Sequence, residues 1–346
     1  MRSWQRNATL ALLMLGGSAG VAAEDIKQPL IVGGSYAPIS EAPWQVFLVI
    51  DDGVSPNQNV CGGLIIADEY VLTAAHCVSG HSSSDITVYA GIDDLDDARD
   101  ASNGITLSNL VVNPNYDSSN FTADIALLTL SKSLPSNAKP IDLLGTSGQI
   151  DLDAEFSAGK SNNLYVSGWG ATTTGGSVSN YLRRTLLTGV TDQQCSWNYT
   201  NNVFSQFLAD ATICANQTVT TGVCSGDSGG ALIWQDPSFA SDADFGYRAV
   251  GIVSFSSREL GCANTQSEDG FTQISNYFDW ISDNIDGGYV QPSDSLSSNI
   301  FTATSGFTPP ALLVPSSSDG GGGGSIGWLS LVFAGMIAAR RRFSYS

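Results

Sequence analysis

The stretch Cys-Ser-Gly-Asp-Ser-Gly-Gly at residues 224–230 decides the fold of this chain and points to its chemistry. A serine hydroxyl is a weak nucleophile at neutral pH, so it needs an imidazole to take its proton and a carboxylate to fix the tautomer of that imidazole. The chain offers a histidine in Leu-Thr-Ala-Ala-His-Cys at residues 72–77 and an aspartate in Asp-Ile-Ala-Leu-Leu at residues 124–128. His76, Asp124 and Ser228 are therefore the candidate catalytic residues.

The order His, Asp, Ser along the chain, together with Ile-Val-Gly-Gly at residues 31–34 and Gly-Trp-Gly at residues 168–170, resembles the chymotrypsin/trypsin family of serine proteases. The resemblance runs from Ile31 to about Ile285. It implies a serine endopeptidase that hydrolyses peptide bonds of proteins or peptides through an acyl-enzyme. It also implies an oxyanion hole formed by the backbone N–H groups of Gly226 and Ser228. This chemistry requires no metal and no cofactor.

Short runs of β-branched and aromatic residues are separated by Gly, Asn, Asp and Ser, a pattern that favours an all-β, Greek-key architecture. Examples are residues 44–50, 63–66, 87–90, 124–130, 163–166 and 249–253. No internal repeat specifies a duplication, so the expectation of two six-stranded β-barrels comes from the trypsin-like resemblance. Residues 276–285 place Phe278, Ile281 and Ile285 on one helical stripe and predict a C-terminal helix.

The cysteine count is even and contains no Cys-x-x-Cys pair, which favours disulfides outside a reducing cytosol over a zinc site. Six cysteines allow fifteen connectivities. The family resemblance selects one of them, which joins Cys61 to Cys77, Cys195 to Cys214, and Cys224 to Cys262.

The N-terminus is typical of a secreted zymogen. Two arginines precede a short apolar run, and Val-Ala-Ala at residues 21–23 predicts a signal peptide over residues 1–23, removed on the Sec pathway; a retained anchor is the alternative. Residues 24–30 then form an activation propeptide. The resemblance implies that cleavage before Ile31 frees an ammonium that pairs with buried Asp227 and completes the oxyanion site. Because Leu30 precedes this junction where trypsin-activated relatives carry Arg or Lys, the activating protease is not expected to be a trypsin.

The specificity pocket departs from that of trypsin. By resemblance, Gly222 occupies the base of the pocket where trypsins carry aspartate. The same resemblance implies that Ser254, Phe255 and Ser256 line the pocket and pair with the substrate backbone. A gapless alignment places Asp269 on the pocket wall and implies a mixed preference for basic and apolar residues. A one-residue deletion would place Gly270 there instead and leave an uncharged pocket for medium apolar residues.

A formal net charge of −19 makes nucleic acid a poor partner and suits a protein kept monomeric by self-repulsion. Five aspartates cluster between residues 93 and 100 in a region where some relatives bind calcium. The ligand spacing of those relatives is not reproduced. A solvated acidic loop is therefore favoured over a calcium site.

The composition changes after the protease domain, which we place at residues 31–286. Residues 287–324 are rich in Ser, Pro and Gly and predict a linker, followed over residues 325–346 by an apolar segment that ends in an arginine cluster. The apolar run from 326 to 339 is short for a comfortable transmembrane helix. This tail resembles the glycine-glycine sorting signals of Gram-negative bacteria, which an intramembrane protease cuts near the glycines; a retained anchor and a simple hydrophobic tail are the alternatives.

Two functions other than proteolysis are compatible with such a chain. The first is a catalytically silent binding protein on the same fold, and the second is a surface adhesin whose acidic loops matter more than its pocket. The intact His76, Asp124 and Ser228 favour the enzyme.

Overall fold

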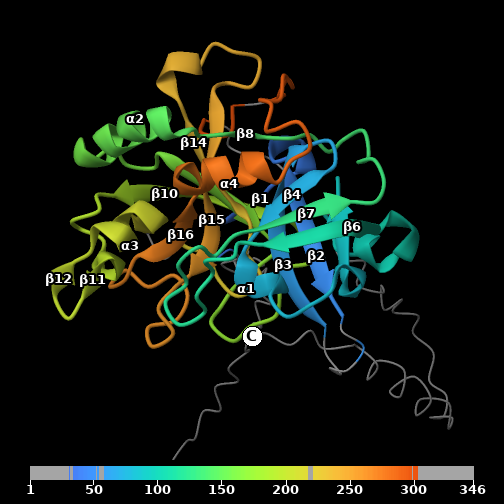
Figure 1. Cartoon of the computed structure of the whole chain (residues 1–346), viewed down its shortest axis with the longest axis horizontal. Coiled ribbons are helices and arrows are strands. Elements are labelled where there is room, and N and C mark those ends of the chain that lie inside the picture. Colours follow the sequence, from blue (N-terminus) through green and yellow to red (C-terminus); the bar gives the residue numbers. More distant parts are fainter. Residues whose placement is uncertain are drawn as a thin grey trace, which may run out of the picture.

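A computed structural model of the chain describes residues 31, 34–51, 53, 58–216, 221–297 and 299–302 (Figure 1). The expected signal peptide, the propeptide and the apolar C-terminal segment lie outside these residues. Within them, no helix combines the length and the apolar character needed to cross a membrane.

The N-terminal half forms one closed antiparallel barrel. Its strands follow the order β2-β3-β4-β7-β6-β5 around the barrel. The strands are β2 (Gln45–Ile50), β3 (Asn59–Ala67), β4 (Tyr70–Thr73), β5 (Ile86–Ala90), β6 (Ile105–Val112) and β7 (Ala126–Leu130). In β2 and β3 nearly every residue is buried, because one face lines the barrel and the other packs against neighbouring parts of the protein.

The C-terminal half forms a second ring of six strands in the order β9-β10-β13-β16-β15-β14, which closes because β14 pairs with β9. The strands are β9 (Leu164–Gly168), β10 (Arg183–Val190), β13 (Thr212–Asn216), β14 (Ala231–Gln235), β15 (Tyr247–Phe255) and β16 (Asp269–Gln273). Two short strands extend this ring: β1 (Ser35–Tyr36) pairs with β10, and β8 (Asp142–Leu143) pairs with β15. The all-β, two-barrel prediction is confirmed.

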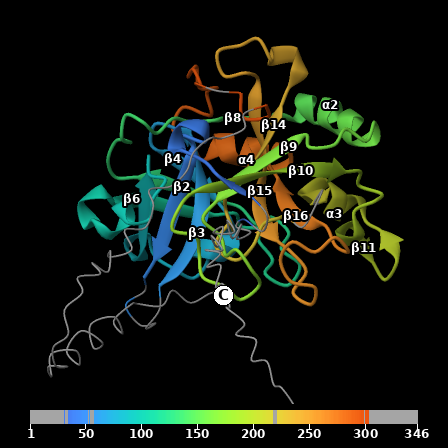
Figure 2. The same ribbon diagram turned by 180° about the vertical axis from the view of Figure 1, so that it is seen from behind.

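The helices lie outside the barrels, as the two opposed views show (Figures 1 and 2). They are α1 (Ala75–Val78), α2 (Thr146–Ser157), α3 (Gln206–Ala211) and α4 (Phe278–Asp283). The C-terminal helix α4 is shorter than predicted because its first turn is a 3-10 helix over Ile274–Tyr277. Ile281 and Ile285 are buried, as the apolar stripe predicts.

The disulfides pair as the family resemblance implied: Cys61 with Cys77, Cys195 with Cys214, and Cys224 with Cys262. The first closes the segment that carries His76, and the third fixes the segment before Ser228. Such cross-links restrict the unfolded chain and indicate an oxidising compartment.

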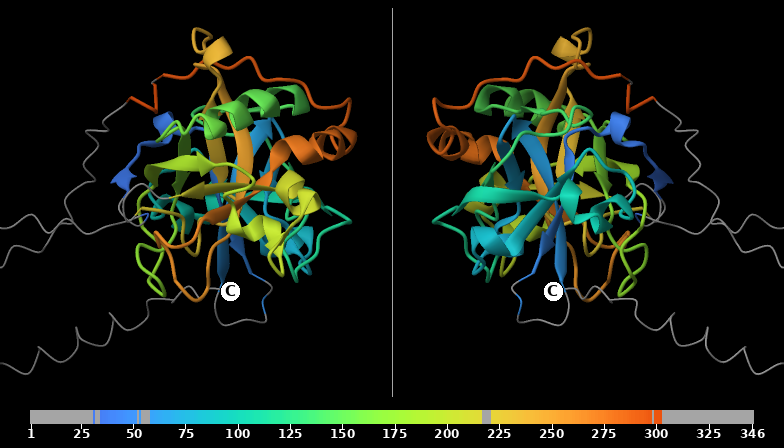
Figure 3. Two further views of the ribbon diagram at one scale, coloured as in Figure 1. Left: turned by 90° about the vertical axis from the view of Figure 1, so that its left-hand side faces the viewer. Right: turned by 90° about the vertical axis from the view of Figure 1, so that its right-hand side faces the viewer.

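A segment that the composition assigned to a linker packs against the body. Residues 286–297 and 299–302, which we call the strap, run from α4 across one edge of the molecule toward β1 (Figure 3). Near its start, the Tyr289 hydroxyl donates to Asp142 Oδ1 at 2.9 Å and accepts from the backbone N–H of Leu143 at 3.0 Å. The folded body therefore extends beyond the boundary at residue 286.

The end of the strap is anchored on the other side of the C-terminal barrel. Ile300 is 1% exposed, and its N–H donates to the Tyr247 hydroxyl at 2.8 Å while its carbonyl accepts from Arg184 Nη1 at 3.1 Å. The ring of Phe301 packs against Tyr165 and Tyr247, with centroid distances of 6.4 and 5.8 Å. These contacts cover the buried ion pair between Arg184 and Glu41.

We expect Tyr289→Phe to lower the free energy of unfolding by about 1–3 kcal/mol, because two buried partners lose a hydrogen bond. The midpoint of thermal unfolding should fall by several degrees. Val290→Ala is the matched control, since Val290 is 75% exposed beside the anchor and its change should have almost no effect. Equal midpoints for the two variants in a calorimetric scan would show that the strap does not stabilise the body.

Candidate active site

The three residues of the predicted triad come from both barrels. His76 lies on α1, and Asp124 lies two residues before β7, so both belong to the N-terminal barrel. Ser228 lies on the turn before β14 of the C-terminal barrel. The interface between the barrels therefore brings together residues that are far apart in the sequence.

Asp124 is fully buried and binds three donors. Its Oδ1 accepts from the backbone N–H of His76 at 2.8 Å, and its Oδ2 lies 2.8 Å from His76 Nδ1 and 2.5 Å from Ser254 Oγ. A carboxylate beside Nδ1 favours the tautomer that carries its proton there, which leaves Nε2 as the proton acceptor. Asp124 and His76 thus form the arrangement that a general base requires.

Ser228 and His76 both approach the sulfur atom of Cys77. Cys77 Sγ is 3.7 Å from His76 Nε2 and 3.8 Å from the carbonyl oxygen of Ser228. That carbonyl also accepts from the Gly62 N–H at 2.7 Å, which ties the serine turn to the N-terminal barrel. Among the described residues the Ser228 hydroxyl makes no hydrogen bond, so the contact with Nε2 is not formed in this conformation. Such contacts commonly tighten when substrate binds.

The backbone around Ser228 has the form that an oxyanion site needs. Gly226 adopts a φ of +97°, a conformation that glycine accepts without strain. Within the described part of the chain, the N–H groups of Gly226 and Ser228 have no acceptor, whereas the intervening Asp227 N–H donates to Cys224 O at 3.0 Å. Two free donors flank the candidate nucleophile.

Asp227 is fully buried beneath this turn. Its carboxylate accepts from the N–H groups of Gly170 at 2.7 Å and Cys224 at 3.0 Å. A side chain at position 170 would collide with this carboxylate, which explains the glycine there. Burial raises the pKa of Asp227 to about 7, against the opposing effect of the two N–H donors. Ile31 is also buried, but in this chain it is still joined to Leu30 and carries no free ammonium.

Residues that were predicted to form the specificity pocket also lie close to one another. Asp269 is 2% exposed, and its Oδ2 accepts from the Val223 N–H at 3.3 Å, so its carboxylate lies next to Gly222. Gly270 pairs with Phe255 in the sheet, and the Phe255 ring fills the space where a side chain at 270 would stand. Ser254 is held by Asp124, and Ser256 is half-buried one residue beyond the end of β15.

A row of packed aromatic rings, which we call the aromatic line, leads away from His76 and was not predicted from the sequence. The ring of His76 packs edge-on against Phe121 at 5.7 Å, Phe121 packs against Phe255 at 5.8 Å, and Phe255 packs against Trp197 at 5.2 Å, all between centroids. Trp197 is fixed by a hydrogen bond from its Nε1 to Glu268 O at 2.8 Å. The sequence signal for this packing was the position of Phe121, three residues before Asp124.

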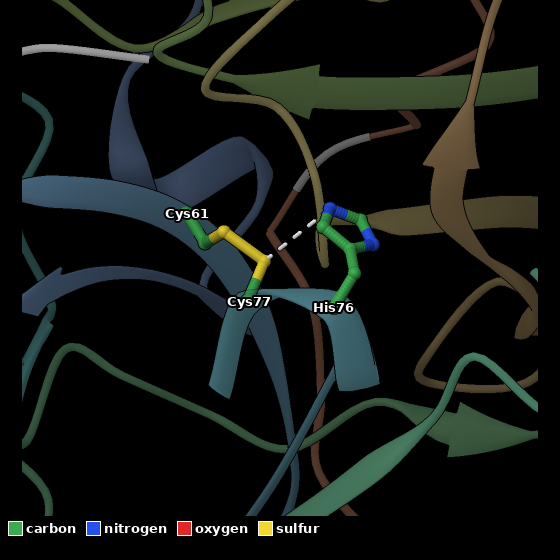
Figure 4. A group of neighbouring side chains, drawn as sticks. All are labelled: Cys61, His76 and Cys77. Carbon is green, nitrogen blue, oxygen red and sulfur yellow. Dashed lines mark hydrogen bonds between the residues drawn. A yellow bond between two sulfur atoms is a disulfide. The ribbon is translucent and has the colours of Figure 1, made fainter. Parts of the chain in front are cut away.

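One group of potential metal ligands contains a disulfide. Within the described residues, Cys61, His76 and Cys77 are the group of potential ligands whose donor atoms lie within 4.8 Å of one another (Figure 4). Both sulfur atoms are joined in a disulfide, so no thiolate remains to bind a metal. In the acidic loop, Asp93 Oδ2 accepts from Ile39 N–H and Asp94 Oδ1 accepts from Asn180 and the N–H of Asp96.

The fold and the site define a class of protein that comparisons with known proteins support. The trypsin family model matches residues 31–281 of the chain. The chain belongs to the trypsin family of serine proteases. It is 35% identical over 257 residues to serine protease SP24D of Anopheles gambiae, covering 72% of this chain and 79% of that protein.

The raised pKa of Asp227 predicts a pH dependence of stability in the unprocessed chain. A carboxyl group whose pKa is higher in the folded state favours folding at low pH, and this contribution is lost as the pH rises through about 7. We therefore expect wild type to lose stability relative to Asp227→Asn between pH 5 and pH 8. Thermal unfolding of both proteins across this range measures the difference; parallel curves would contradict the burial of an ionisable Asp227.

Proposed function

We propose that this serine protease is an endopeptidase whose catalytic residues are His76, Asp124 and Ser228. Ser228 Oγ attacks the peptide carbonyl while His76 Nε2 takes its proton, and the same imidazole then protonates the leaving amine. Asp124 holds the imidazole and stabilises its charged form. The N–H groups of Gly226 and Ser228 bind the oxyanion.

The observation that carries this proposal is the environment of Asp124. A buried carboxylate with three donors, one of them Nδ1 of a largely buried histidine, is the part of the mechanism that a silent relative would have no reason to keep. The free N–H groups beside Ser228 add an oxyanion site. Together they support the enzyme over a binding protein on the same fold.

Exchanging the buried carboxylate tests the proposed mechanism. In the mature protein that begins at Ile31, we expect Asp124→Asn to lower kcat by about 10⁴-fold, because an amide no longer favours the reactive tautomer. Asp117→Asn is the matched control, since Asp117 is exposed on the same loop, and it should keep nearly full activity. Hydrolysis of a fluorogenic protein substrate measures both variants; equal activities would remove Asp124 from the mechanism.

Activation by cleavage before Ile31 is part of the proposal. The buried carboxylate of Asp227 lies beside the candidate oxyanion donors and has no cationic partner among the described residues of the unprocessed chain. An ammonium at Ile31 would supply one and lower the pKa of Asp227 again. A protease that accepts Leu30 before the cleaved bond would perform the activation.

We further propose a mixed preference for basic and apolar residues before the scissile bond. The supporting observation is the contact of Asp269 Oδ2 with the Val223 N–H at 3.3 Å, which puts its carboxylate next to Gly222. A cation can reach such a carboxylate by a charge-assisted contact, but the geometry need not favour the fork of an arginine.

Peptides that differ only before the scissile bond test this preference. Asp269→Asn should lower kcat/KM for Lys and Arg peptides by about 10- to 100-fold, as expected when a charged hydrogen bond is lost. Values for Leu and Phe peptides should change little, which makes them the internal control. Indifference of wild type to Lys and Arg would instead favour the alignment with an uncharged pocket.

The disulfides suit a secreted protein, as trypsin-like proteases typically are. We propose that export follows the Sec pathway and that the apolar tail with its arginine cluster directs the protein to the surface of a Gram-negative bacterium, where a sorting protease removes it. This part rests on the sequence of the tail alone.

A further inference from the structure

The far end of the strap, residues 299–302, contacts two strands that lead to the two partners of the proposed activation pair. We call these residues the strap end. On β10 its contact is Arg184, whose Nη1 donates to the Ile300 carbonyl at 3.1 Å. On β9 its contact is Tyr165, whose ring centroid lies 6.4 Å from that of Phe301. A segment that follows the C-terminal helix thus packs on both strands.

Strand β1 is the fixed point from which Ile31 extends. It has only two residues and lies at the edge of the second ring. Ser35 pairs with Arg184, and Tyr36 pairs with Arg183. Three residues separate Ile31 from Ser35. Because a two-residue edge strand has little stability of its own, the contacts of its partner strand β10 decide how firmly β1 stays in place.

Arg184 joins the strap end to this pairing through a buried ion pair. Its Nε lies 3.1 Å from Glu41 Oε2, and the two side chains are 8% and 9% exposed. A buried ion pair is favourable only where further hydrogen bonds satisfy its remaining polar groups. The Ile300 carbonyl accepts one such bond, and Ile300 itself is buried. Loss of the strap end would leave Arg184 without this acceptor and weaken β10 where it holds β1.

The contact on β9 leads to Asp227. Phe301 packs on Tyr165, which is fully buried on this strand. At the end of the same strand, Gly168 lies against the Asp227 carboxylate, since a Cβ at position 168 would collide with it. Just beyond the strand, the Gly170 N–H donates to Asp227 Oδ1 at 2.7 Å. The strap end therefore packs on the strand that positions the carboxylate which a freed ammonium must reach.

We propose that the strap end is a clasp that stabilises the activated form of the enzyme, because it holds β1 and β9 where the ammonium of Ile31 needs them. A short tether with a fixed origin keeps this ammonium at a high effective concentration near its carboxylate partner. If β1 separates from β10, the tether becomes longer and the effective concentration falls. Ile300 and Phe301 are then positioning residues that act through Arg184 and Tyr165. The inference rests on the proposed activation by cleavage before Ile31.

The reactivity of the Ile31 amine in the mature protein tests the proposal. Cyanate carbamylates a free amine but not an ammonium buried in an ion pair, so the rate reports the fraction of molecules whose N-terminus lies outside the fold. Mass spectrometry of the N-terminal peptide measures this rate. We expect Ile300→Ala/Phe301→Ala to raise it about tenfold, a typical size for the coupling between two sites.

A milder variant and a matched control separate the clasp from general destabilisation. Tyr247→Phe removes the acceptor of the Ile300 N–H, keeps the ring, and should raise the rate about two- to tenfold even if the double variant does not fold. Tyr289→Phe is the control, because it weakens the start of the strap and leaves the contacts of the strap end intact. Its carbamylation rate should stay close to that of wild type.

Two results would overturn the clasp alone. One is an Ile31 amine that is as well protected in Tyr247→Phe and in the folded double variant as in wild type. The other is an equal loss of protection in Tyr289→Phe, because the effect would then follow overall stability. A different result would overturn the proposed activation together with the clasp: a wild-type Ile31 amine that reacts as fast as that of a short peptide with the same first residues.

Discussion

The buried carboxylate of Asp124 is the constraint on which the rest of the structure depends. Asp124 belongs to the N-terminal barrel, but Ser254 from the C-terminal barrel donates to its side chain and Thr272 donates to its backbone carbonyl at 2.9 Å. A buried charge must keep its donors, since an unpaired carboxylate away from water is strongly unfavourable. The same bonds therefore orient His76 and fix one barrel against the other. The bond from Gly62 N–H to Ser228 O provides a second tie across this interface.

The candidate catalytic residues and the fold class could be predicted because both depend on local signals. Short motifs surround His76, Asp124 and Ser228, and β-branched runs mark the strands of both barrels. Helix α2 gave a weaker signal, because its buried stripe begins with the polar Gln149 while Ile150 is exposed. The strap gave almost no signal in the sequence. Its anchors Tyr289 and Ile300 are isolated in a Ser/Pro-rich stretch, and their partners Asp142 and Tyr247 are far away in the sequence.

The surroundings of the site follow from contacts that no motif records. Phe121 lies in the loop before β7, Phe255 ends β15 and Trp197 lies in a 3-10 helix over Ser196–Asn198, so these rings meet only after the barrels have closed. The place of Asp269 was open between two alignments, and its contact with Val223 N–H depends on the register of β16 against β13 and β15. The candidate triad is thus recognisable from local motifs, whereas its surroundings depend on tertiary packing.

The most direct measurement is the reaction of the mature protein, beginning at Ile31, with a serine-directed fluorophosphonate, followed by mass spectrometry of its peptides. We predict one adduct per molecule, on Ser228, in the mature wild type, and none in Ser228→Ala or in the unprocessed chain. Correctly matured and folded protein that forms no adduct, or forms it at another residue, would contradict the central claim and favour a binding protein on a protease fold.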